Sequence, residues 1–255
     1  MGNLAQMAKA IGYEVFGCDN KVYPPMSDEL NSSGINFFQG YEEKNIVDAD
    51  IYVIGNAISK ENNLLKEILR LEKKVVSGPE WLYQNILSNK KVIAVSGTHG
   101  KTTVTSMIAH TLIKNNFDPN YLIAGIPKKL EKSWNISNDE VFVIEADEYD
   151  TCYFDKRPKF FHYRPNILLI NNIEFDHADI YENIEMIEKN FIELINESDL
   201  CISRAGANSL AEISFMNKPF IAIPLPTAKD DHQMDNAKFY KKAGCCWILN
   251  QKSLI

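Results

Sequence analysis

Val92-Ile93-Ala94-Val95, followed by Gly97-Thr98-His99-Gly100-Lys101-Thr102-Thr103, is the stretch that decides the fold of this 255-residue chain. The apolar run, the glycine-rich turn and the amphipathic segment from Met107 to Ile113 predict a strand, a tight loop and a helix. In that setting backbone N–H groups and the positive end of the helix bind phosphate oxygens. Lys101 would reach the outer phosphates and Thr102 would ligate Mg²⁺. The sequence therefore predicts a site for a nucleoside triphosphate.

This loop departs from the common G-x-x-x-x-G-K-[ST] form, because Val95 stands where the first glycine would be. Its assignment depends on the flanking strand and helix. The alternative is a turn rich in glycine and threonine that carries a surface lysine. The flanking pattern favours phosphate binding.

The composition predicts a globular chain without a nucleic-acid surface. Apolar residues make up 45% and charged residues 24%, and 27 Lys and Arg against 34 Asp and Glu give a net charge of −7. The 5 cysteines form no C-x-x-C pair, which predicts reduced thiols and a cytoplasmic location. We therefore expect neither export nor a lipid anchor, and no apolar run in the sequence reaches the roughly 18 residues that span a bilayer.

Residues 1–90 alternate short apolar runs with helical patterns, which predicts a parallel α/β domain. The chain starts inside a helix from Asn3 to Ile11, so we expect a Rossmann-like domain truncated before its first strand. Asp19 follows a strand and could meet a ribose hydroxyl or be a solvated turn residue. The expected strands are Tyr13 to Phe16, Asp50 to Ile54 and Val75 to Val76, with a helix from Leu64 to Leu71.

Residues 91–197 form a second α/β pattern, with strands expected at Val92 to Val95, Val141 to Ile144 and Ile167 to Ile170. Acidic residues gather after two of these strands. Ligands of open parallel sheets bind beyond the carboxyl ends of the strands, and oxygen ligands suit Mg²⁺. The alternative is a solvated, charged loop. The two groups are Glu145, Asp147, Glu148 and Asp150, and Glu174, Asp176, His177 and Asp179.

Residues 198–255 form a third pattern, strand–helix–strand–helix–strand. The strands are expected at Leu200 to Ser203, Phe220 to Ile223 and Cys245 to Leu249, and the helices at Ser209 to Met216 and Asp235 to Lys242. The fold class is therefore α/β throughout, with domains at 1–90, 91–197 and 198–255.

Residues 1–196 resemble the Mur ligases, the ATP-dependent enzymes that build the peptide stem of peptidoglycan. The resemblance rests on the loop at 97–103, on Ile144-Glu145-Ala146-Asp147-Glu148-Tyr149-Asp150, and on Asn171-Asn172-Ile173-Glu174-Phe175-Asp176-His177. It implies an amide-forming ligase in which ATP phosphorylates a carboxylate and an amine attacks the acyl phosphate. Carried over by position, the resemblance implies that Lys101 holds the β- and γ-phosphates and that Thr102 binds one Mg²⁺. It implies that Glu145 and His177 bind a second metal ion near the transferred phosphoryl group.

Within that family, Ser77-Gly78-Pro79-Glu80-Trp81-Leu82 and Phe154-Asp155-Lys156-Arg157 resemble the branch that acts in cell-wall recycling. That branch joins UDP-N-acetylmuramate to the murein tripeptide L-alanyl-γ-D-glutamyl-meso-diaminopimelate. The relatives that add L-alanine to the same nucleotide sugar are the alternative. These segments favour the tripeptide.

Residues 198–255 resemble the donor-binding half of a GT-B glycosyltransferase that uses UDP-N-acetylglucosamine to make lipid II. By that resemblance Gly206 and Ser209 would meet the diphosphate, Glu212 the ribose and Gln233 the sugar. We therefore expect a hybrid chain, with a partial ligase joined to a transferase fragment. Three functions follow as hypotheses: an ATP-dependent ligase, a UDP-sugar transferase, or a nucleotide-binding remnant without catalysis.

Overall fold

The computed structural model describes residues 1–125, 127, 129–147, 150–171, 192–228 and 231–251. Two compact units make up the chain, residues 1–182 and residues 183–255. Both are mixtures of helices and parallel strands, so the predicted α/β class is confirmed. Within the described ranges, no helix has both the length and the apolar character needed to cross a bilayer.

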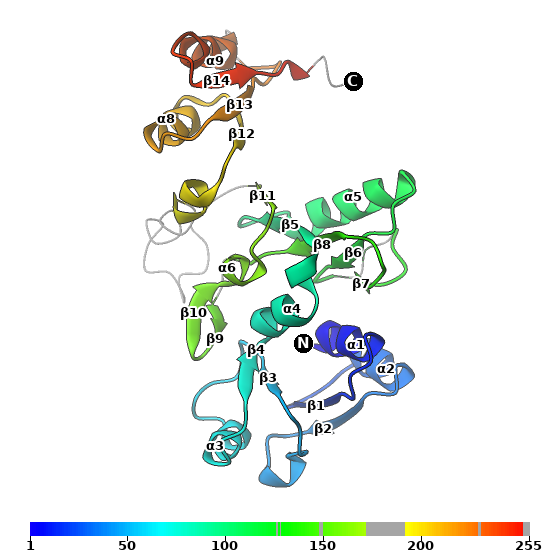
Figure 1. The fold of residues 1–255 in the computed structure, drawn as a ribbon. Helices are drawn as coiled ribbons and strands as arrows, with labels where there is room; N and C mark the ends of the chain where they lie inside the picture. Colours follow the sequence, from blue (N-terminus) through cyan, green and yellow to red (C-terminus); the bar gives the residue numbers. More distant parts are fainter. Residues whose placement is uncertain (126, 128, 148–149, 172–191, 229–230, 252–255) are drawn as a thin grey trace. The chain divides into compact units, whose positions relative to one another are not determined.

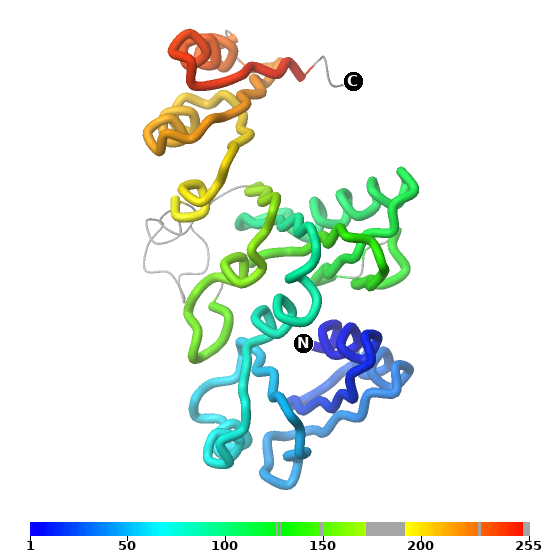
Figure 2. Tube along the Cα trace, viewed as in Figure 1, coloured from blue at the N-terminus to red at the C-terminus, as the bar shows by residue number. Residues whose placement is uncertain are grey.

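The front of the first unit pairs its strands in parallel, β1 with β2 and β3 with β4. Helix α1 packs beside α2, as Figures 1 and 2 both show. The elements are α1 (Gly2–Ala10), β1 (Phe16–Asp19), α2 (Met26–Ser32), β2 (Asn36–Gln39), η1 (Glu43–Asn45), β3 (Tyr52–Ile54), α3 (Asn63–Arg70), β4 (Val75–Ser77), α4 (Gly78–Asn85) and η2 (Leu87–Asn89).

The strand expected at Tyr13 to Phe16 is wrong, because β1 begins at Phe16 and Asp19 is its last residue. Tyr13 is held by other contacts. Its N–H donates to the carbonyl of Ala8 at 3.1 Å, and its ring lies 5.7 Å from the ring of Trp81 in an edge-on arrangement. The side chain that resembled a strand residue therefore packs against α4.

In the described part of the chain, the sheet that carries the glycine-rich loop has five strands in the order β11-β5-β8-β6-β7. All neighbours are parallel except β6 and β7. Strand β8 is buried along most of its length, as expected for a parallel strand covered on both faces. Helix α5 packs on β5 and β8 (Figure 1). The elements are β5 (Lys91–Ser96), α5 (Lys101–Lys114), β6 (Asn120–Leu122), β7 (Trp134–Asn135), β8 (Val141–Glu145) and β11 (Ile167–Ile170).

An antiparallel hairpin and a short helix lie between β8 and β11, and the sequence pattern predicted neither of them. They are β9 (Asp150–Cys152), β10 (Asp155–Pro158) and α6 (Lys159–Tyr163). The first acidic group is therefore divided. Glu145 is the last residue of β8, Asp147 lies in the connection and Asp150 starts β9.

The second unit has the predicted strand–helix–strand–helix–strand order, with a parallel sheet β12-β13-β14. Its core is made by side chains from both helices and the sheet, among them Leu210, Phe220 and Ala237. The elements are β12 (Cys201–Arg204), α8 (Ala207–Phe215), β13 (Phe220–Ile223), α9 (His232–Lys242) and β14 (Cys246–Ile248).

Candidate functional site

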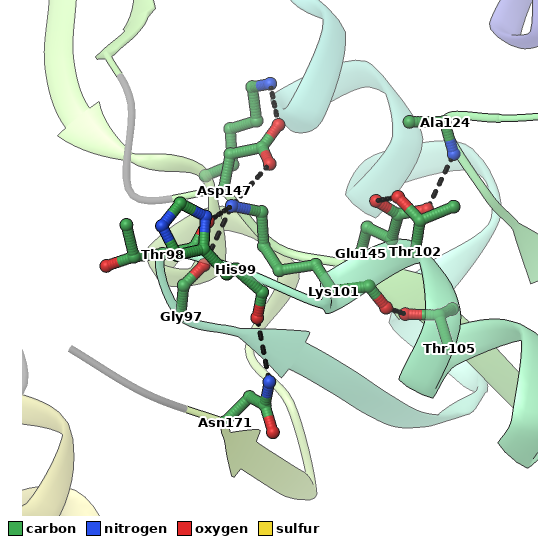
Figure 3. Close-up of polar contacts among 11 residues, drawn as sticks. Gly97, Thr98, His99, Lys101, Thr102, Thr105, Ala124, Glu145, Asp147 and Asn171 are labelled. Atoms are coloured by element: carbon green, nitrogen blue, oxygen red, sulfur yellow. Dashed lines mark hydrogen bonds and ion pairs between the residues drawn. The ribbon is translucent and has the colours of Figure 1, made fainter. Parts of the chain in front are cut away.

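The turn between β5 and α5 needs glycine at two positions. Gly97 has φ 123° and Gly100 has φ 79°, both in the region that side chains with a Cβ avoid. Asn171, directly after β11, donates from Nδ2 to the carbonyl of His99 at 2.7 Å (Figure 3). A Cβ on Gly100 would lie 2.8 Å from that nitrogen. The neighbouring strand therefore holds the loop in place.

Helix α5 begins directly at this loop. Its N-cap is Gly100, no side chain among the described residues caps it, and its first turn has no acidic residue. The first N–H groups of a helix have no partner within the helix, and the helix dipole places partial positive charge there. The start of α5 therefore suits an anion such as phosphate.

Lys101 lies folded over its own loop. Its Nζ donates to the carbonyl of Gly97 at 2.7 Å and approaches that of Thr98 at 3.4 Å, and it lies 3.7 Å from Oδ1 of Asp147 (Figure 3). Only 12% of the lysine side chain is exposed. The ammonium is thus close to where phosphate oxygens would sit on the loop.

Thr102 and Glu145 meet at the carboxyl edge of the sheet. Glu145 is paired across the sheet with Val95, just before the loop. The Thr102 hydroxyl donates to Glu145 Oε2 at 2.9 Å, and the N–H of Ala124 donates to Oε1 at 2.7 Å. Burial raises the pKa of the Glu145 carboxyl, while these two hydrogen bonds oppose that rise.

This set of residues fits a phosphate group and a divalent cation. The hydroxyl of Thr102 and the carboxylate of Glu145 are the oxygen ligands that Mg²⁺ prefers. Ser96, at the end of β5, has a buried hydroxyl with no hydrogen-bond partner in the part of the chain described. No group of three or more His, Cys, Asp or Glu that could hold a metal occurs among the described residues.

The structure brings together the predicted residues of the loop and of β8. Gly97, Thr98, His99 and Gly100 form the turn, and Lys101, Thr102 and Thr103 begin α5. His177 and the rest of the second acidic group, Glu174, Asp176 and Asp179, lie outside the described residues, as does Glu148.

The predicted UDP-sugar residues all lie in the second unit. Gly206 precedes α8, Ser209 and Glu212 belong to α8, and Gln233 belongs to α9. Gln233 accepts a hydrogen bond through Oε1 from the N–H of Leu225 at 2.9 Å. Helices α8 and α9 pack on each other, and Asn236 of α9 donates to the carbonyl of Ala205 at 3.1 Å.

The side chains of Asn171 and Lys159 contribute to the loop site, and neither has a role in the sequence-based prediction. Asn171 could have been found, because it immediately follows a predicted strand whose end meets the loop. Lys159 could not. It pairs with Asp147 at 2.7 Å, but it lies in a helix that no sequence pattern indicated.

Comparison with known protein families gives three matches. The catalytic domain of the Mur ligase family matches residues 1–90, and the Mur ligase middle domain matches residues 95–203. The glycosyltransferase family 28 C-terminal domain matches residues 166–255, so the last two matches overlap. The predicted likeness to two families is confirmed.

Relatives with curated names support the first two matches. UDP-N-acetylmuramate--L-alanyl-gamma-D-glutamyl-meso-2,6-diaminoheptandioate ligase of Haemophilus influenzae is 43% identical over 83% of this chain and 48% of the relative. The UDP-N-acetylmuramate--L-alanine ligase of Clostridium beijerinckii is 33% identical over 84% of this chain and 45% of the relative. The chain spans about half the length of these curated relatives.

A solved structure extends the likeness to the fold. The crystal structure of UDP-N-acetylmuramate:L-alanyl-gamma-D-glutamyl-meso-diaminopimelate ligase from Neisseria meningitides has a TM-score of 0.74 and is 35% identical. The comparison covers 98% of this chain and 74% of that one. Together with the glycine loop and the Thr102–Glu145 contact, these matches show that the chain belongs, over residues 1–203, to the Mur ligase family.

Proposed function

We propose that this chain binds ATP with Mg²⁺ on the loop at 97–103 and uses it to form an amide bond. The observation that carries the proposal is the contact between the Thr102 hydroxyl and Glu145, at 2.9 Å, at the start of helix α5. It joins two oxygen ligands for a cation to a site for phosphate.

The side chains have distinct roles in this proposal. Lys101 leaves its own loop carbonyls and binds the outer phosphates, while the N–H groups at the start of α5 bind the remaining phosphate oxygens. Thr102 and Glu145 hold the cation, and we assign His177 to it as well. The cation, when bound, offsets the negative charge that develops on the transferred phosphoryl group.

The substrates we propose are those in the names of the relatives, UDP-N-acetylmuramate and L-alanyl-γ-D-glutamyl-meso-diaminopimelate. The muramate carboxylate oxygen attacks the γ-phosphorus, and the bond to the ADP oxygen breaks. The peptide amine then attacks the carbonyl carbon of the acyl phosphate. Inorganic phosphate leaves, the amine gives up a proton and the amide bond remains. L-alanine as acceptor is the alternative, as in the second group of relatives.

The test is a coupled assay of ADP release and amide product with the purified chain, ATP, Mg²⁺, UDP-N-acetylmuramate and tripeptide. We expect product that depends on all four additions. Lys101→Ala should abolish it, and Lys114→Ala, at the other end of α5, should not. Product formation by the Lys101 variant at the wild-type rate would contradict the proposal. Product with L-alanine but not with tripeptide would reassign the acceptor.

For the second unit we propose a site for UDP-N-acetylglucosamine at the start of α8, supported by the match to the glycosyltransferase family 28 C-terminal domain. Gly206 and Ser209 would bind the diphosphate, Glu212 the ribose and Gln233 the sugar. Helix α8 has no side-chain cap among the described residues and no acidic residue in its first turn. Titration of the chain with UDP-N-acetylglucosamine tests this site. Saturable binding that Glu212→Ala weakens is expected, and no binding would contradict it.

A further inference from the structure

One carboxylate lies between two lysines next to the glycine loop. Asp147 Oδ2 is 2.7 Å from Nζ of Lys159, and its Oδ1 is 3.7 Å from Nζ of Lys101. All three side chains are mostly covered, with 12% of Lys101, 27% of Asp147 and 21% of Lys159 exposed. Water therefore screens these charges less than it would on an open surface.

The fold fixes Lys159 in this position. It is the first residue of α6, and its N–H donates to the carbonyl of Asp147 at 3.3 Å. Phe160 and Tyr163 of the same helix are buried, with 0% and 5% exposed, and α6 packs against α4 and β5. Movement of the Lys159 backbone would require movement of these buried rings, and the Lys159 side chain is held by its contact with Asp147. Lys101, in contrast, is held in place by polar contacts with its loop.

We propose that Lys159 is a positioning residue that keeps Asp147 paired when Lys101 moves from its loop to the phosphates of a nucleotide. The inference rests on the proposed ATP site. With both lysines present, the three side chains carry one net positive charge. When Lys101 turns to phosphate, Asp147 still has a cation at 2.7 Å.

Without Lys159, the charge balance around Asp147 changes. Asp147 would depend on Lys101, and release of Lys101 would leave an unpaired carboxylate beside incoming phosphates. Such a carboxylate is costly when it is partly buried and repels anions. Lys159→Gln should therefore weaken nucleotide binding through Asp147, in addition to any effect of removing a distant positive charge.

A double-mutant cycle separates these two effects. We would titrate Mg·ATP into the full chain and into Lys159→Gln, Asp147→Asn and the double variant. We expect Lys159→Gln to weaken binding about tenfold, the size of a typical coupling between contacting charges. In the Asp147→Asn background, Lys159→Gln should weaken the binding of Mg·ATP by less than about twofold, because the carboxylate is absent. An equal loss in both backgrounds, or no loss in either, would overturn the proposal.

A matched control removes a similar charge from the same segment. Lys156 pairs with Asp150 at 2.6 Å on the hairpin, and its side chain is 69% exposed. Lys156→Gln should leave the affinity for Mg·ATP unchanged. Lys159→Arg should restore it, since the guanidinium can still pair with Asp147. A loss in Lys156→Gln equal to that in Lys159→Gln would overturn the specific role of Lys159.

A second measurement needs no nucleotide, so it separates this inference from the proposed function. The rate at which an amine-selective acylating reagent modifies Lys101 is followed by mass spectrometry. In Lys159→Gln, Asp147 turns to Lys101, and we expect slower modification. In Asp147→Asn we expect faster modification. Unchanged rates in both variants would overturn the inference, whereas failure of the wild-type chain to bind Mg·ATP would overturn the proposed function.

Discussion

Gly100→Ala should damage the loop for two reasons that can be measured separately. The backbone at Gly100 has φ 79°, and an alanine there costs about 1–2 kcal/mol in this left-handed region. The new Cβ would lie 2.8 Å from Nδ2 of Asn171, so the bond from that nitrogen to His99 must break or shift. The loss of that bond adds about 1 kcal/mol.

The matched control is Gly40→Ala. Gly40 has φ 84°, close to that of Gly100, but a Cβ there would meet nothing within 4 Å. It should therefore show the backbone cost alone, about 1–2 kcal/mol. Gly100→Ala should exceed it by about 1 kcal/mol, and this excess should disappear in an Asn171→Ala background.

Native-state hydrogen exchange is the suitable assay, because it reports the free energy of opening at each site rather than one value for a chain of two units. Amides of β5 report on Gly100, and amides of β1 and β2 report on Gly40. If Gly100→Ala costs no more than Gly40→Ala, the contact with Asn171 does not hold the loop. The reasoning about the loop is then refuted.

Three further predictions concern Thr102 in the site, His162 in the short helix α6, and Asn62, which caps α3. Thr102→Val removes the hydroxyl that donates a hydrogen bond to Glu145. Calorimetry should show that the affinity for Mg·ATP falls at least about tenfold, while the affinity for ATP without Mg²⁺ changes little. Burial lowers the pKa of His162, so the folded state binds fewer protons than the unfolded state. The stability of the wild-type chain should therefore fall as the pH drops through about 6.5. In thermal unfolding, His162→Gln should lose less stability than the wild type between about pH 7.5 and 5.5. Asn62→Ala removes the side-chain oxygen that accepts a hydrogen bond from the N–H of Leu65, 3.1 Å away. The free energy of opening of α3, measured by hydrogen exchange, should fall by about 1 kcal/mol, and Asn62→Ser should keep most of that free energy. Equal pH profiles for wild type and His162→Gln, or a neutral Asn62→Ala, would count against these assignments.

The local elements could be predicted where pattern and packing agree. The strand and helix around the loop at 97–103 follow from an apolar run, a glycine turn and helical spacing, and all these signals are local. The strand at Tyr13 to Phe16 is wrong because a tertiary contact decides it: Tyr13 packs on Trp81, which is distant in sequence. Pattern reasoning has no access to such contacts.

The same distinction between local pattern and tertiary contact applies to the candidate site. The position of Glu145 beside the loop could be predicted, because the carboxyl ends of neighbouring parallel strands lie at the same edge of the sheet. The bond from Ala124 to Glu145 and the pairing of Lys159 with Asp147 could not, since each depends on how separate segments are packed. Charged residues in a loop look alike in sequence, and only the fold decides which of them meet.

The most direct test of the central claim is a calorimetric titration of Mg·ATP into the purified chain and into Lys101→Ala, with Lys114→Ala as control. The account predicts saturable binding by the wild-type chain and by the control, and an affinity at least about tenfold weaker in Lys101→Ala. No saturable binding by the wild-type chain, or equal affinity in all three proteins, would contradict it.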